Sequence, residues 1–104
     1  MPALTVRFSL RDEDAATEFD ALVADTVAKI RIEEPGTLVY AVSAVRDAPL
    51  SRVFYEVYES RAAFEAHERQ DHVRRFLSER ERHLTGVRVE FLDIPRGKGI
   101  PPAP

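Results

Sequence analysis

The chain of 104 residues contains no cysteine, no tryptophan and no asparagine. Without cysteine it cannot form a disulfide, use a thiolate nucleophile or hold a metal or iron–sulfur cluster through sulfur. It also lacks an apolar run near the ~20 residues of a membrane span, so we expect no membrane contact. The N-terminal stretch MPALTVRFSLRDED carries charges where a signal peptide needs an apolar core. We therefore expect a cytoplasmic protein.

A clustered basic surface is also missing. Acidic residues outnumber basic ones 18 to 15, for a net charge of -3, and this argues against a nucleic-acid partner. The length suits one small domain, which we expect over residues 1–94. Residues 95–104, PRGKGIPPAP, are rich in proline and glycine and show no periodicity, which indicates a tail that is extended or disordered unless something holds it.

Strand-like patterns occur in four places. Residues 4–10 and 87–92 alternate apolar and polar side chains, as half-buried strands do. Residues 37–45 and 52–58 are apolar on both faces, and residues 46–50 connect them as a hairpin. The sequence therefore predicts four strands.

Helical spacing fills the gaps between the strands. A stripe at intervals of three and four residues follows the first strand, and Pro35 and Gly36 end that helix. The stripe comprises Phe19, Leu22, Val23, Thr26 and Ile30. Ser60 can cap a second helix, and Asp71 can cap a third.

The resulting order, β-α-β-β-α(α)-β, is typical of the α+β class and the ferredoxin-like split β-α-β sandwich. In that fold an antiparallel four-stranded sheet carries its helices on one face. Because the two middle strands are apolar on both faces, the uncovered face needs a partner. A second copy of the chain supplies that surface most simply, so we predict a homodimer packed sheet to sheet. We also expect residues 95–104 to reach across the partner subunit.

Two of the three histidines lie in FEAHERQDHVRRF, residues 64–76. His67 and His72 stand about 140° apart around a continuous helix, whereas helical metal ligands usually stand four residues apart. A helix break at Gln70 would bring the two rings closer, but no third ligand is evident, so we predict no metal site. His72 and His83 are expected at the surface.

His67 itself has two interpretations. It lies one turn after Phe64, on the side expected to face the sheet. A histidine there could exchange protons near neutrality, since an unperturbed imidazole titrates near pH ~6.5. It could equally be a partly buried histidine bonded to a carboxylate or a backbone carbonyl. The pattern leaves both open.

Glu56 is the most unusual residue of the strands. Alternation places it between Phe54 and Tyr58 on one face. On the helix-covered face its carboxylate would need a partner or a raised pKa, and His67 is the partner we consider. At an open sheet edge, Glu56 would instead be solvated or paired with an arginine.

The segments EPGTLVYAV, FYEVYES and AAFEAH, with the later His72 and Phe76, resemble the antibiotic biosynthesis monooxygenase (ABM) domain family. The resemblance extends from Leu4 to Leu92. It implies a ferredoxin-like protomer that dimerises into an α/β barrel, with a pocket between sheet and helices. Better-understood members oxygenate quinols, anthrones and related phenols with O2, without metal or flavin. The resemblance therefore implies a small aromatic substrate, O2 and no cofactor.

Carried over by position, the resemblance implies catalytic roles for three residues. His67 would be the general base, Glu56 would orient it or set its pKa, and Tyr58 would donate a hydrogen bond to the substrate oxygen. Phe54 and Phe64 would hold the aromatic ring. The remaining substrate-binding candidates are Tyr40, His72 and Phe76.

The chain also departs from the family pattern. Tyr58 replaces a common tryptophan, Phe54 an asparagine of some oxygenating members, and Phe64 a tyrosine of others. Haem-degrading members use asparagine, tryptophan and a histidine near the place of Leu77, so haem degradation is disfavoured. Two alternatives remain: a non-catalytic dimeric small-molecule-binding or regulatory protein, and a polyketide cyclase or isomerase that uses the same acid/base pair.

Overall fold

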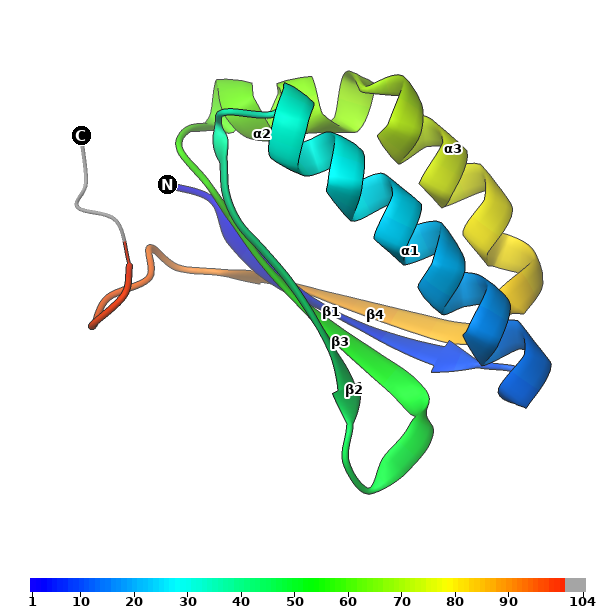
Figure 1. Cartoon of the computed structure of the whole chain (residues 1–104). Coiled ribbons are helices and arrows are strands. Elements are labelled where there is room, and N and C mark those ends of the chain that lie inside the picture. Colours follow the sequence, from blue (N-terminus) through cyan, green and yellow to red (C-terminus); the bar gives the residue numbers. More distant parts are fainter. Residues whose placement is uncertain (101–104) are drawn as a thin grey trace.

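The computed structural model describes residues 1–100 as one α+β sheet-and-helix sandwich (Figure 1). Four antiparallel strands form the sheet in the order β2-β3-β1-β4. The strands are β1 (Ala3–Leu10), β2 (Thr37–Val45), β3 (Ala48–Tyr58) and β4 (Leu84–Leu92). The helices are α1 (Glu13–Glu33), α2 (Arg61–Arg69), α3 (Asp71–Glu79) and the short 3-10 helix η1 (Arg80–His83). The predicted ferredoxin-like arrangement is confirmed.

Side-chain caps mark the starts of α1 and α2. The Asp12 carboxylate accepts a 2.8 Å hydrogen bond from the backbone N–H of Ala15 and starts α1. The Ser60 hydroxyl accepts one of 3.1 Å from the N–H of Ala63 and starts α2. No helix within residues 1–100 is both long and apolar enough to cross a membrane.

Two strands begin three or more residues earlier than predicted, and β1 begins one residue earlier, at Ala3. The third strand begins at Ala48 rather than residue 52, because β2 and β3 continue to pair until only residues 46–47 remain as the turn. The fourth begins at Leu84 rather than residue 87. There a register shift lets Leu84 pair with Leu10 of β1, an irregularity that no local apolar pattern indicates.

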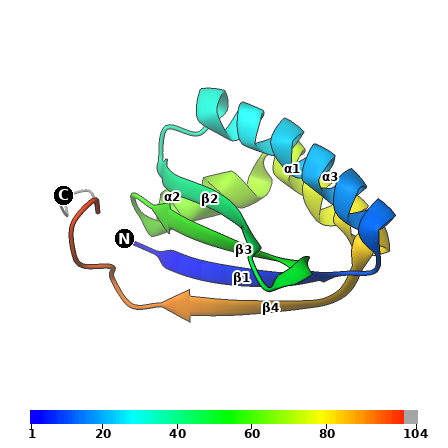
Figure 2. The ribbon, with the colours of Figure 1, turned by 60° about the horizontal axis from the view of Figure 1, so that its bottom comes forward.

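All three main helices lie on one face of the sheet, as the two views show (Figures 1 and 2). Between helices and sheet lies an aromatic core. The Phe8 ring centroid is 4.7 Å from that of Phe54 and 5.1 Å from that of Phe19. Phe76 of α3 completes the cluster at 5.8 Å from Phe19. These contacts fix α1 and α3 over the central strands β1 and β3.

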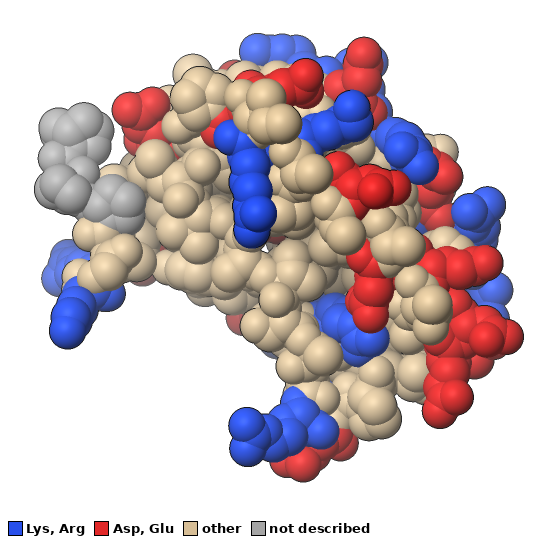
Figure 3. All heavy atoms as spheres, viewed as in Figure 1, with Lys and Arg blue, Asp and Glu red and all other residues tan. Residues whose placement is uncertain are grey.

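The opposite face of the sheet carries no helix. Val39, Val53 and Tyr55 project from it and remain half-buried. In the view of Figure 3, charged side chains gather over the helices, while most atoms over the strands are uncharged. The predicted uncovered face is therefore present. The expected reach of the tail over a partner stays a prediction, and residues 101–104 lie outside the described part of the chain.

The helices also stop short of β4. Its helix-side residues Val87 and Val89 are each 46% exposed, and Phe91 is 71% exposed. The antiparallel register with β1 places Val89 opposite Val6 and Phe91 opposite Leu4. These side chains therefore extend the apolar face of the sheet beyond the area that the helices cover. This edge is open to solvent.

Candidate functional site

A cavity of about 260 Å³ lies between the sheet and the helices α2 and α3. Its sheet side comes from all four strands, through Leu4, Val6, Phe8, Tyr40, Phe54, Glu56, Val89 and Phe91. Its helix side comes from Phe64, His67, Glu68, Val73, Phe76, Leu77 and Arg80. Most of this wall is apolar, and the exposed side chains of Val89 and Phe91 mark its open side.

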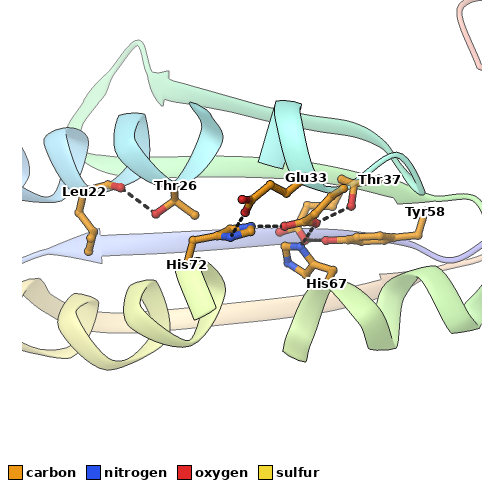
Figure 4. A network of polar contacts seen from close by, with 9 residues as sticks. Leu22, Thr26, Glu33, Thr37, Tyr58, His67 and His72 are labelled. Atoms are coloured by element: carbon orange, nitrogen blue, oxygen red, sulfur yellow. Dashed lines mark hydrogen bonds and ion pairs between the residues drawn. The ribbon is translucent and has the colours of Figure 1, made fainter. Parts of the chain in front are cut away.

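One buried carboxylate organises the polar end of this region. Glu34, the residue that ends α1, is 7% exposed. Its Oε1 lies 2.6 Å from Nδ1 of His67, and its Oε2 lies 2.5 Å from Nε2 of His72. The Thr37 hydroxyl donates a third bond, of 2.7 Å, to Oε1. Figure 4 labels His67, His72 and Thr37, and its dashed lines mark these contacts.

The break between α2 and α3 makes the convergence possible. Gln70 leaves helical geometry with φ -66° and ψ 139°, so α3 starts in a new direction. His67 at the end of α2 and His72 at the start of α3 can then both reach the end of α1. A continuous helix would have kept the two rings about 140° apart.

The carboxylate also fixes which nitrogen of His67 bears hydrogen. An ionised carboxylate only accepts hydrogen bonds, so Nδ1 of His67 donates and Nε2 remains for the cavity that the residue lines. The ring is enclosed by Tyr58 and Tyr40, at centroid distances of 5.1 and 5.6 Å. His67 is therefore bonded to a carboxylate and also stands at the cavity wall.

Glu56 has a different partner from the one considered. It is 5% exposed, and its Oε1 accepts a 2.5 Å hydrogen bond from the Tyr58 hydroxyl, while His67, the partner considered from the sequence, is bonded to Glu34. Burial raises the Glu56 pKa to about 7, although the Tyr58 bond and the nearby Arg80 both lower it. Near neutral pH this carboxyl can therefore take up or release a proton.

Tyr58 is fully buried and does not line the cavity. Burial, followed by the neighbouring Glu56, raises its pKa well above the usual range, so the hydroxyl stays protonated. Its hydrogen is already donated to Glu56. A hydrogen bond from Tyr58 to a substrate oxygen, as expected from the resemblance, would require this bond to break.

Arg80, at the start of η1, is a cavity residue that the sequence analysis missed. Its guanidinium carbon lies 5.4 Å from the centroid of Phe8 and 5.6 Å from that of Phe76. Within residues 1–100 its Nε is buried without a hydrogen-bond partner, and burial lowers the Arg80 pKa. A buried donor of this kind favours a ligand that brings an acceptor.

The other candidates divide between the cavity and its surroundings. Six predicted site residues line it: Tyr40, Phe54, Glu56, Phe64, His67 and Phe76. His72 does not; instead of lying at the surface it is 6% exposed and lines a separate surface cleft. His83 was also expected at the surface, and its 3% exposure shows that this was wrong. The end of η1 is held beside the end of β1, where the His83 carbonyl accepts a 2.9 Å hydrogen bond from the backbone N–H of Arg11.

Residues 1–100 contain no group of three or more histidine, aspartate or glutamate side chains arranged to hold a metal ion. The two histidines of FEAHERQDHVRRF instead share a carboxylate.

The family model for antibiotic biosynthesis monooxygenase matches residues 1–79, which include the cavity residues up to η1 and leave out β4. The chain belongs to the ABM family. No curated protein matches it.

Solved structures share the fold of this ABM protein. Rv0793 from Mycobacterium tuberculosis is 26% identical with a TM-score of 0.83, over 94% of this chain and 98% of that one. A structure described as an antibiotic biosynthesis monooxygenase is 24% identical with a TM-score of 0.81, over 92% of this chain and all of that one. A conserved protein from Methanosarcina mazei Go1 is 15% identical with a TM-score of 0.79, over 88% of this chain and 89% of that one. The last two show the fold alone.

Proposed function

We propose that this ABM protein is a cofactor-independent monooxygenase that oxidises a phenolic, quinol or anthrone-like aromatic with O2. The observation that carries the proposal is His67, a histidine with Nδ1 fixed by a buried carboxylate and Nε2 left for a mostly apolar cavity. A base held in one orientation beside an apolar slot suits proton removal from a flat aromatic.

Proton removal prepares such a substrate for O2. His67 Nε2 takes the proton, and the electron-rich anion passes one electron to O2. Recombination of the two radicals forms a carbon–oxygen bond and a peroxide. The peroxide anion takes back the proton from His67. Loss of the remaining hydrogen on the oxygenated carbon then breaks the O–O bond, and the departing hydroxide combines with that hydrogen as water. The second oxygen remains on the substrate as a carbonyl.

Arg80 is the group best placed to stabilise the anion. It lines the cavity, its guanidinium is partly withdrawn from solvent, and its Nε has no hydrogen-bond partner within residues 1–100, with Oε1 of Glu81 lying 3.9 Å away. A cation in such a site stabilises developing charge more than it would in water. We therefore assign Arg80 the role first expected of Tyr58, whose hydroxyl is engaged by Glu56. Phe64 and Phe76 would hold the ring.

Oxygen uptake tests the proposal. Metal-free protein is incubated with a panel of anthrones and quinols, and O2 consumption is compared with the protein-free rate. We expect His67→Gln to lower kcat/KM by roughly 10²- to 10⁴-fold, the usual contribution of a general base. His83→Gln is the matched control, because His83 is equally buried and does not line the cavity. Uptake at the protein-free rate across the panel contradicts the function, and an unchanged His67→Gln variant contradicts the role of His67.

A second candidate is a non-catalytic small-molecule-binding or regulatory protein. The observation that favours it is the scarcity of hydroxyl groups at the cavity: Phe54 and Phe64 stand there, Tyr58 is engaged by Glu56, and Tyr40 alone among the lining residues carries a hydroxyl. Saturable binding of an anthrone without O2 consumption would support it. Turnover under nitrogen would instead indicate a cyclase or isomerase that uses the same base.

We also propose that the protein works as a homodimer through the uncovered face of the sheet. Support comes from the helices lying on one side only and from half-buried Val39, Val53 and Tyr55 on the other (Figure 2). Light scattering after size exclusion should give twice the chain mass, and Val53→Asp should give a monomer. A stable wild-type monomer at micromolar concentration would refute the dimer.

A further inference from the structure

The carboxylate of Glu34 joins two compartments of the molecule. His67, on its Oε1, lines the inner cavity. His72, on its Oε2, lines a cleft at the outer surface. The chain of contacts continues outward, because Nδ1 of His72 lies 3.4 Å from Oε2 of Glu33, whose side chain is 54% exposed (Figure 4). Four side chains therefore connect the cavity with solvent.

The geometry also indicates how the two histidines are charged. His72 meets a carboxylate at each ring nitrogen, Glu34 at Nε2 and Glu33 at Nδ1. A carboxylate oxygen near each ring nitrogen favours an N–H at both positions, which is the imidazolium form of His72. His67 meets a carboxylate only at Nδ1. It therefore keeps its Nε2 lone pair, and the charge on His72 balances that on Glu34.

We propose that Glu33, Glu34 and His72 act as positioning residues for His67. They form a charge-handover unit, in which His72 gives up a proton when His67 takes one up. When Nε2 of His67 takes a proton from the cavity, Glu34 would face two imidazolium rings in a buried site, which is costly. His72 therefore releases its Nδ1 hydrogen to Glu33 or to water in the cleft. One proton enters and one leaves, while both hydrogen bonds to Glu34 remain.

Other charged groups surround the exit. The cleft that His72 lines also contains Asp25, Lys29 and Glu33 from α1, and Asp71 and Arg75 from α3. Its carboxylates can accept the released proton at a surface open to solvent. Charge thus moves from His72 to His67 without a change in the net charge of the buried cluster. The inference rests on the proposed function only in that a substrate supplies the incoming proton.

The first test needs no substrate. NMR titration of the full chain with 15N-labelled histidine resolves the protonation of each ring nitrogen. We expect His67 as the Nδ1–H form and His72 doubly protonated at neutral pH. His72→Gln keeps a donor for Glu34 but removes the competing charge, so His67 should become doubly protonated at a higher pH. His83→Gln should leave that titration unchanged. A neutral His72 in the wild type, or no change in the titration of His67 in His72→Gln, overturns the handover.

The second test follows the proton itself. Under nitrogen, binding of 1,8-dihydroxyanthrone is measured calorimetrically in two buffers of different ionisation enthalpy. Linkage predicts release of about one proton to buffer per ligand bound by the wild type and by His83→Gln, and close to none by His72→Gln. Binding without release overturns the handover but leaves O2 uptake to decide the proposed function. If O2 uptake is absent while His72→Gln still changes the NMR titration of His67, the proposed function is rejected and the handover stands.

Discussion

Replacing Glu56 with glutamine should remove one source of the stability that the wild type loses as the pH rises toward neutrality. The Glu56 pKa is about 7 in the folded protein, against an ordinary value of 4.5. The folded protein therefore holds this proton more tightly than the unfolded chain. Its contribution to stability is complete below the unfolded value and is lost as the pH rises through about 7.

The size of this effect on stability follows from the difference between the two pKa values of Glu56. One pKa unit is worth about 1.4 kcal/mol, so about 2.5 units set an upper bound of ~3 kcal/mol. Urea unfolding of wild type and Glu56→Gln between about pH 5 and pH 8 should show the difference in unfolding free energy shifting by about 2 to 3 kcal/mol in favour of the variant. The glutamine carbonyl can still accept the Tyr58 hydrogen bond. Protein concentration is kept constant, because a dimer links stability to it.

Glu90→Gln provides the matched control for this experiment. Glu90 lies on the exposed edge strand β4, with its side chain 55% exposed, so the same substitution should leave the pH dependence of unfolding as in the wild type. Curves of unfolding free energy against pH that run parallel for wild type and Glu56→Gln over the whole range would refute this reasoning. They would mean that ionising the buried Glu56 carboxyl does not destabilise the folded protein.

Three further substitutions test the packing around the site, each by urea unfolding. Phe19→Ala removes a fully buried ring and should cost about 3 to 5 kcal/mol; a loss below 1 kcal/mol would contradict its place in the core. Gly36→Ala would set a methyl group 2.7 Å from Cβ of Ala63, so we expect a loss of about 1 to 3 kcal/mol, and a neutral result would show that α2 moves freely. Ser60→Ala removes the cap of α2 and should cost about 1 kcal/mol, with Ser60→Thr largely restoring it.

Local sequence patterns were sufficient to predict the fold. Strict alternation in β1 put Leu4, Val6 and Phe8 on the core face, where they are buried. The apolar stripe of α1, with Pro35 and Gly36 as the signal for its end, also predicted the helix correctly. These features are short-range, because a strand repeats every two residues and a helix about every 3.6. The start of β4 was missed since it depends on pairing with Leu10, which lies far away in sequence.

The site depended on contacts that no local pattern contains. Glu34 is separated from His67 by 33 residues, so no local pattern joins the two. Arg80 could have been found. It follows Val73 and Phe76 at intervals of three and four residues, which continues the apolar stripe with a charged side chain. A charged residue on an apolar stripe is therefore a useful signal for a cavity.

The alternation of β3 limits how this protein can change in evolution. Phe54 and Glu56 belong to the cavity, whereas Val53 and Tyr55 belong to the opposite face. Insertion of a single residue within this stretch would exchange the two sets and spoil both surfaces at once. Additions at residues 46–47 would only lengthen a turn. Relatives should therefore vary in length at the hairpin tip and keep a constant spacing from residue 52 to residue 58.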